Sequence, residues 1–205
     1  MSLPYDTMNW RCDLMRIPSS YVGRAVANAS LNLEHLSVSF MVDASDFFDA
    51  RELSWKWPNL TWLALTSRLL VPEESPMELD SMLRAAAAAA LKMPNIETME
   101  IWNGAKGLAM LFRYQRAGRR PAVITCRGTW ELTLRPLVIQ AWDSVALRHG
   151  GQGHVIVKEL LDAGACVQSH GDAICHLKLS RPVIRPVSLR QIQLEHKIRE
   201  GMLSQ

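Results

Sequence analysis

The chain has 205 residues, a formal net charge of +3 and 48% hydrophobic residues, as expected of a single globular domain. This composition excludes a disordered chain. Its scattered basic residues argue against a nucleic-acid module, which gathers positive charge and aromatic side chains in one motif. No apolar run approaches the roughly 18 residues that cross a membrane, and the first residues do not follow the signal-peptide pattern. We therefore expect a cytoplasmic or nuclear protein without a membrane partner.

A repeated phrase is the main feature of the sequence. Residues 1–30 show no clear periodicity, and we expect them to form an irregular N-terminal cap. The phrase Asn-Leu-x-x-Leu-x-aliphatic then begins at Asn32 and at Asn59, and it returns at Asn95 with Ile and Met in place of the leucines. Such copies indicate short strands, each followed by a helix, that must stack because one unit cannot bury its own apolar face.

The first two copies are followed by helix signals. The three phrases predict strands over residues 33–40, 60–65 and 96–101. A short helix is expected over residues 44–53, with Phe47 and Phe48 as buried anchors. After the second strand, Ser75 can cap a helix that has Pro76 at its first position and Glu78 at the capping-box position. The alanine-rich run that follows favours a helix extending to about Met93.

The pattern loosens after the third strand. Asn103-Gly104 predicts a turn, and residues 106–115 fit either a helix or an extended segment. Two further strands are expected over residues 122–126 and 130–134. Pro136 begins a largely apolar sequence that predicts a buried helix ending at Gly150-Gly151.

The last third of the chain is partly ambiguous. Residues 154–163 alternate like a strand at first and resemble a helix end later. Residues 174–179 repeat the tail of the phrase, and they predict a fourth core strand. Residues 187–205 predict a C-terminal amphipathic helix, in which Ser188 and Gln191 form a capping box. Self-association through this helix is one alternative for its role.

The spacing of the phrases defines the expected fold. The copies are 27 and 36 residues apart, whereas leucine-rich repeats commonly take about 20 to 29 residues. The turn asparagine of such repeats is replaced here by Met41, Arg68 and Gly104. The sequence therefore predicts one α/β domain over residues 1–205. We expect a degenerate leucine-rich-repeat-like solenoid of stacked strand-helix units, with a parallel sheet on one face.

These features together carry a family resemblance. The three phrases, the run Ser67-Arg-Leu-Leu-Val-Pro72, the helix beginning at Pro136 and the closing run from His176 to Ile192 resemble the C-terminal leucine-rich-repeat-like region of uncharacterised fungal F-box-type proteins. Such proteins join an F-box, which docks on the Skp1 adaptor of a ubiquitin ligase, to repeats that recruit a target. The resemblance implies a protein partner, such as a degradation target. It implies Skp1 binding only if an F-box is supplied elsewhere, because none is visible here.

The strand face supplies candidate contact residues. Trp62 occupies the second variable position of Leu-x-x-Leu, which points away from the core. Exposed aromatic residues on repeat arrays often anchor partners, although core packing is the commoner fate of tryptophan. The mixed polarity of the face suits a protein partner. The candidate contact residues are His35, Trp62, Arg68, Glu97 and Trp102.

An enzyme is the rival interpretation. Asp43, Asp46 and Asp49 have a three-residue spacing that would align three carboxylates on a helix face, where they could hold Mg²⁺. Alternatively, these acids lie at a helix N-terminus, where they favour the dipole and one caps the helix. A zinc site built from Cys166, His170, Cys175 and His176 does not match a familiar ligand spacing. We therefore assign no catalytic residue, metal ligand or cofactor from the sequence.

Overall fold

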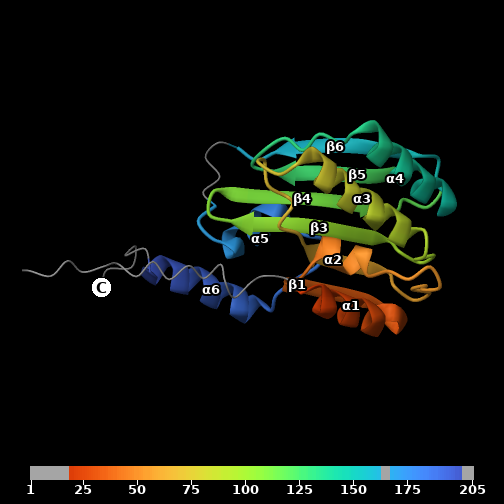
Figure 1. Ribbon diagram of the computed structural model, residues 1–205. Helices are drawn as coiled ribbons and strands as arrows, with labels where there is room; N and C mark the ends of the chain where they lie inside the picture. Colours follow the sequence, from red (N-terminus) through yellow and green to blue (C-terminus); the bar gives the residue numbers. More distant parts are fainter. Residues whose placement is uncertain (1–18, 163–166, 200–205) are drawn as a thin grey trace, which may run out of the picture.

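The structure, a computed structural model, describes residues 19–162 and 167–199 (Figure 1). The strands form one sheet in the order β1-β2-β3-β4-β5-β6. In this part of the chain the strands are β1 (His35–Asp43), β2 (Trp62–Thr66), β3 (Thr98–Ala105), β4 (Leu108–Gln115), β5 (Ala122–Gly128) and β6 (His154–Leu160). The helices are α1 (Ser20–Ala29), α2 (Ala44–Asp49), α3 (Pro76–Ala90), α4 (Pro136–Arg148), α5 (His170–Leu177) and α6 (Pro186–Arg199), with a 3₁₀ turn at Ser30–Asn32.

The helices divide between the two faces of the sheet. Figure 1 shows α1, α2, α3 and α4 on one face and α5 on the other. The larger core joins the sheet to the first group, with Ala27 of α1, Phe47 of α2, Leu83 of α3 and Trp142 of α4 all buried. A smaller core lies under α5, where Ala173 and Leu177 pack among buried residues of β3 and β4. None of the helices in the described ranges combines the length and apolar character that a membrane crossing requires.

The three phrases lie side by side in the sheet. His35 pairs with Trp62, and Trp62 pairs with Thr98, so the fourth residue of each phrase occupies the same level in three parallel strands. Leu36, Leu63 and Met99 follow at the next level and all point into the larger core. The spacing of apolar residues within the phrase therefore matches the register of β1, β2 and β3.

The prediction of an entirely parallel sheet is wrong. β3 pairs with β4, and β4 with β5, in antiparallel fashion, whereas the other neighbouring strands are parallel. Only two residues, Lys106 and Gly107, separate β3 from β4, and Gly107 has a φ of +74°. Such a short loop can join only antiparallel strands. The turn predicted at Asn103-Gly104 is also wrong, because both residues lie within β3.

Two helix predictions are confirmed at their N-termini. α3 begins at Pro76 and α4 at Pro136, where proline fits because the first helical N–H has no partner within the helix. Ser75 precedes α3, but its side chain forms no capping hydrogen bond. The alanine run has a packing role: Ala86, Ala87, Ala89 and Ala90 are buried and let α3 lie close to the sheet.

Three other predictions are wrong. Residues 174–179 were expected to form a strand, but most of them belong to α5. The reason is a local cap, in which Ser169 accepts a hydrogen bond from the backbone of Asp172 while its hydroxyl donates to the Asp172 carboxylate. Residues 20–29 of the expected irregular cap form α1, and residues 130–134 form no strand. Residues 1–18 of the cap and residues 200–205 of the terminal helix lie outside the described residues.

Candidate functional site

The chain itself covers the strand face on which we expected a partner. The open side of β2 and β3 carries Trp62, Glu100 and Trp102, but all three side chains are buried. Phe40 packs edge-on against Trp102, with ring centroids 5.3 Å apart, and α5 contacts both β3 and β4. Trp62 and Trp102 are therefore occupied within the domain and do not form an exposed aromatic surface.

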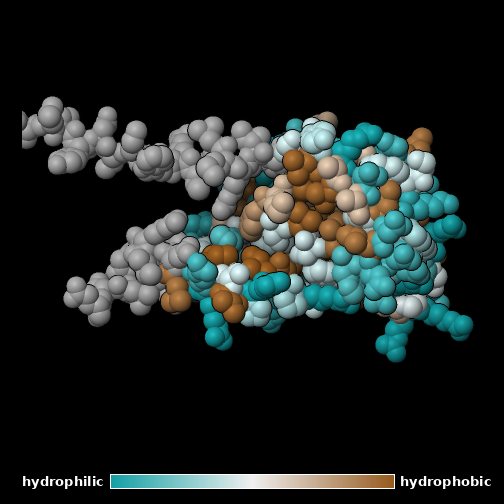
Figure 2. All heavy atoms as spheres, turned by 90° about the horizontal axis from the view of Figure 1, so that it is seen from below, coloured by the Kyte–Doolittle hydropathy of each residue, from teal (hydrophilic) through white to brown (hydrophobic). Residues whose placement is uncertain are grey.

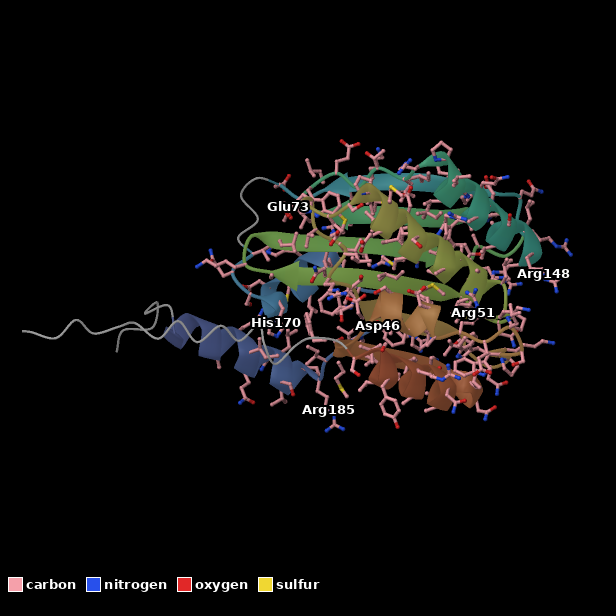
Figure 3. The ribbon with its side chains drawn as sticks, viewed as in Figure 1. Asp46, Arg51, Glu73, Arg148, His170 and Arg185 are labelled. Atoms are coloured by element: carbon pink, nitrogen blue, oxygen red, sulfur yellow. The ribbon has the colours of Figure 1, made fainter. Side chains whose placement is uncertain are left out.

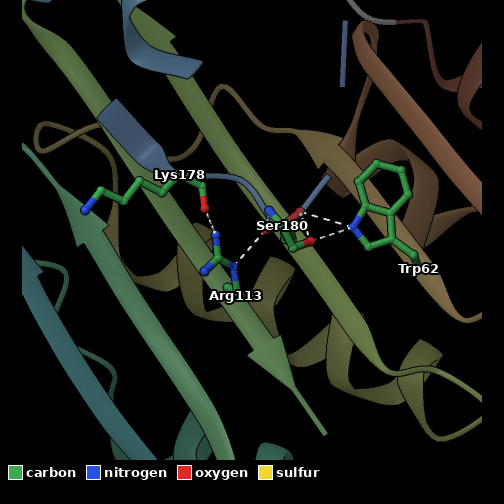
Figure 4. Close-up of polar contacts among 5 residues, drawn as sticks. Trp62, Arg113, Lys178 and Ser180 are labelled. Atoms are coloured by element: carbon green, nitrogen blue, oxygen red, sulfur yellow. Dashed lines mark hydrogen bonds and ion pairs between the residues drawn. The ribbon is translucent and has the colours of Figure 1, made fainter. Parts of the chain in front are cut away.

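A polar cluster binds α5 and the segment after it, including Lys178 and Ser180, to the sheet (Figure 4). Arg113 of β4 pairs with the fully buried carboxylate of Glu100 at 2.7 Å. The backbone N–H and hydroxyl of Ser180 both donate to Glu100, and the Trp62 indole N–H donates to the Ser180 hydroxyl at 2.9 Å. Arg113 also donates to the carbonyl of Lys178. A buried carboxylate needs such compensation, because an unpaired buried charge is strongly destabilising.

The remaining predicted contact residues do not form one surface. His35, Arg68 and Glu97 are exposed, but His35 lies on the edge strand β1 and Arg68 follows the carboxyl end of β2. Glu97 lies just before β3, at the opposite end of the sheet. The length of β2 separates Arg68 from the other two residues, while His35 and Glu97 lie near the same end of the sheet with β2 between them.

One residue of the acidic group, Asp43, caps a helix. Asp43 precedes α2, and its Oδ1 accepts hydrogen bonds from the Ser45 backbone at 2.9 Å and from the Ser67 hydroxyl at 3.1 Å. Its Oδ2 accepts one from the Arg68 backbone at 2.7 Å. Burial raises the pKa of Asp46, and the neighbouring charge of Asp43 raises it further. Asp43 is thus committed to joining α2 to the loop after β2.

The carboxyl ends of parallel strands are the usual ligand site of an α/β sheet. Here they border a hollow of about 350 Å³, whose lining includes Asp43, Thr66 and Asn103. Thr66 accepts a hydrogen bond from the Phe40 backbone, and Asn103 accepts one from Gly104 and donates to the Leu70 carbonyl. Asp43, Thr66 and Asn103 are therefore already engaged within the fold. In the described ranges, no group of three or more His, Cys, Asp or Glu side chains is placed to hold a metal ion. Cys166 of the considered zinc grouping lies outside those ranges.

The edge strand β6 carries an apolar surface that sequence reasoning did not identify. Val155 is 50% exposed, Val157 38%, Ile156 36% and Leu160 67%. The contiguous apolar run from Val155 to Val157 was the available signal, but residues 154–163 fitted a strand and a helix equally well. The strand order, which places β6 at an edge, could not be read from that run.

The other edge of the sheet is different. On β1, residues 39–42 have no partner on β2, so the strand bulges between Val38 and Asp43. Phe40 within this bulge has a φ of +61°. The face seen from the β1 side also carries apolar side chains near its middle (Figure 2). Leu33, just before β1, and Met41, within it, are exposed apolar residues. A bulge bends and twists an edge strand and so impairs further pairing.

These features define an α/β domain with one mixed sheet, four helices on one face and the chain's own C-terminal segment on the other. The chain belongs to a family described only as a family of unknown function (DUF6546), whose model matches residues 1–185. No curated protein and no solved structure matches it.

Proposed function

We propose that this domain is a protein-protein interaction module that binds an extended segment of a partner as an added strand beside β6. The observation that carries this proposal is a regular edge strand with exposed apolar side chains. Unpaired strand edges readily accept another chain, and proteins use this mode to recognise extended peptides.

The backbone of β6 has hydrogen-bonding groups to offer. Ala122 donates to Gly153 at one end of the β5-β6 ladder, and Leu161 donates to Gly128 at the other. In a parallel ladder, alternate residues bond to the same neighbour. With the observed register, this alternation directs the backbone groups of Val155 and Val157 toward β5 and those of Ile156 and Lys158 outward.

The side chains of β6 offer apolar contacts on both faces. Val155 and Val157 pair with Val123 and Thr125 of β5 and share one face, while Ile156 lies on the other. A strand added beside β6 would place its own side chains next to these, and such cross-strand pairs each contribute roughly 0.2–1 kcal/mol. This edge therefore offers side-chain specificity in addition to backbone hydrogen bonds.

The identity of the partner is a further part of the proposal. The resemblance to F-box-type proteins supports a degradation target, and it supports Skp1 binding only where an F-box is supplied elsewhere. A setting in the cytoplasm or nucleus fits the same interpretation. The rival interpretation is an enzyme with a site at Asp43, Asp46 and Asp49. We do not propose it, because Asp43 is already used to cap α2.

The test compares two proline substitutions by affinity purification, with cross-linking, from cells that naturally produce the protein. Ile156→Pro removes an outward N–H from β6 and leaves the ladder to β5 intact. Ser37→Pro is the matched control on β1, where the bond from Thr61 to Glu34 directs Ser37 outward. We expect Ile156→Pro to lose a partner that the wild type and Ser37→Pro retain. Retention of every cross-linked partner by Ile156→Pro would exclude strand addition at β6.

A further inference from the structure

A second surface lies at the amino ends of the parallel strands, where α3 and α4 end. A hollow of about 460 Å³ is lined there by Lys56, Lys92, Arg116 and Arg148, together with Leu91, Pro94 and His149. Figure 3 shows Arg148 at this end of the molecule and His170 at the opposite end. Four cations from separate parts of the fold, and no acidic side chain, therefore line one hollow.

Several other cations of the described residues are neutralised by acidic partners, whereas these four are not. In the described ranges, Arg24, Arg113, Arg127, Arg135 and Lys158 each pair with a carboxylate. None of the four lining cations forms such a pair there. Arg116 donates to the carbonyl of Pro94 at 3.2 Å, which leaves its charge uncompensated. Their positive charge is therefore available to a ligand.

Cations often stabilise the negative C-terminal ends of helices, but this effect explains only part of the positive charge around the hollow. α3 and α4 both direct their C-termini toward the hollow, and each C-terminus is equivalent to about −0.5 elementary charge. Two such ends supply about −1 against four positive side chains. Most of the positive charge is left over, so a stabilising role at the helix ends does not explain the whole cluster.

His149 adds a buried polar group to the lining. Its side chain belongs to a residue that is 5% exposed, and its Nδ1 lies 3.2 Å from the Tyr114 hydroxyl. The carbonyls of Ala90 and Met93 face the ring, but Nε2 has no well-formed hydrogen bond within the described ranges. Burial, followed by the charge of Arg116, lowers the pKa of His149. An anion bound in the hollow would raise the pKa of His149, because its negative charge favours the imidazolium.

We infer that this hollow binds a small molecule through its phosphate group, with the guanidinium groups of Arg116 and Arg148 contacting the phosphate oxygens. Guanidinium groups match the geometry of phosphate and can bind it in bidentate fashion. The ammonium groups of Lys56 and Lys92 add long-range attraction. The volume lies within the roughly 300–1,000 Å³ of ordinary ligand sites, and Leu91 and Pro94 give an organic part of the ligand apolar contacts. This inference does not depend on the partner proposed for β6.

Calorimetric titration of the full chain at low ionic strength tests the inference. The probes are inorganic phosphate, for a free anion, and ribose 5-phosphate, for an organic phosphate. We expect saturable binding that weakens with added salt. Arg116→Gln and Arg148→Gln should each weaken it about tenfold or more, since a hydrogen bond to a charged group contributes about 1.5–3 kcal/mol.

Arg84→Gln is the matched control, because Arg84 is an exposed arginine of α3 that does not line the hollow. It should leave the affinity nearly unchanged. Tighter binding of ribose 5-phosphate would identify an organic phosphate as the ligand, and tighter binding of inorganic phosphate would identify the free anion. Absence of saturable binding to both probes would overturn the inference. An equal loss in Arg84→Gln would do the same, because it would indicate attraction by overall charge.

A nuclear magnetic resonance titration of His149 gives a second readout. The groups that face its ring are Tyr114 of β4, Arg116 after β4, Arg148 of α4, the carbonyl of Ala90 at the end of α3 and the carbonyl of Met93 after it. Saturation with the phosphate probe should raise the pKa of His149, and an Arg116→Gln/Arg148→Gln double variant should not show this rise. Saturable binding that leaves the pKa of His149 unchanged would place the anion elsewhere and overturn the assignment.

Discussion

The carboxylate of Glu100 on β3 accepts a 2.8 Å hydrogen bond from the backbone amide of Ser180, which lies 80 residues further along the chain. The same carboxylate pairs with Arg113. The buried carboxylate of Glu100 thus holds the segment after α5 on the sheet, and Ser180 and Arg113 together compensate its charge.

Replacement of that charge should destabilise the domain. We expect Glu100→Gln to lower the free energy of unfolding by about 3 kcal/mol, because it leaves Arg113 without its ionic partner in a buried setting. Urea unfolding followed by circular dichroism measures this. Arg24→Gln removes the exposed pair with Glu52 and should cost less than about 1 kcal/mol. Equal losses in the two variants would contradict a dominant role for the buried cluster.

The contact between β3 and α5 leaves no room for a larger residue at position 104. A Cβ added at Gly104 would lie 2.3 Å from the Cβ of Ala173. We expect Gly104→Ala to cost about 1–3 kcal/mol and to speed amide hydrogen exchange in α5. Adding Ala173→Gly should recover part of this loss, although glycine in a helix itself costs about 1 kcal/mol. Strictly additive losses in the double variant would mean that the two positions do not meet.

The cap formed by Asp43 predicts unequal roles for the acidic residues. Asp43→Ala should cost about 2 kcal/mol, because the Ser45 and Arg68 amides lose their acceptor. Asp49 is exposed, and Asp49→Ala should change stability by less than about 0.5 kcal/mol. Thermal unfolding measures both variants. A rise in the wild-type melting temperature with Mg²⁺ that disappears in Asp43→Ala would instead favour the metal-binding interpretation.

His149 predicts a dependence of stability on pH. The folded protein has a lowered pKa for this group, because burial and then Arg116 disfavour the imidazolium. The unfolded chain takes up the proton near the ordinary value of about 6.5 and therefore binds more protons in this range. Stability should fall as pH drops through that value toward the folded pKa. His149→Gln should show a shallower decline between about pH 7 and pH 5 in urea unfolding series. An unchanged slope would contradict this assignment.

The stability cost of proline substitutions in β6 should distinguish backbone N–H groups that bond to β5 from those that face outward. Val157→Pro removes a donor to β5 and should cost about 3 kcal/mol or more. Ile156→Pro removes an outward donor and should cost far less, because edge strands tolerate proline at such positions. Thermal unfolding of the two variants decides this. A similar loss in both would mean that the proposed alternation of hydrogen bonds is wrong.

Much of the fold could be predicted where the signal is local. Pro76 and Pro136 mark helix starts by their missing N–H, and the alternating apolar residues of the three phrases predict β1, β2 and β3. The strand predicted from the phrase tail in residues 174–179 is wrong, because the cap formed by Ser169 and Asp172 just before it favours a helix. The antiparallel direction of β4 depends on a turn of two residues, Lys106 and Gly107. This turn could not be predicted from apolar periodicity, because it is too short to have one.

The candidate sites were harder to predict because they depend on distant contacts. The spacing within Leu-x-x-Leu correctly turns Trp62 away from the larger core, yet nothing near Trp62 indicates that Ser180 covers it. Likewise, Lys56, Lys92, Arg116 and Arg148 are scattered along the sequence. They meet because α3, α4 and β4 end, and β2 begins, on the same side of the sheet.

The alignment of the three phrases has a genetic consequence. Because side chains alternate strictly along a strand, an in-frame insertion of one codon between Leu63 and Leu65 would exchange the two faces of the rest of β2. The same insertion between Pro72 and Glu73, two exposed residues of the loop between β2 and α3, would alter only the length of a surface turn. Inherited length changes should therefore accumulate between the phrases, at the ends of the sheet, and be eliminated within them.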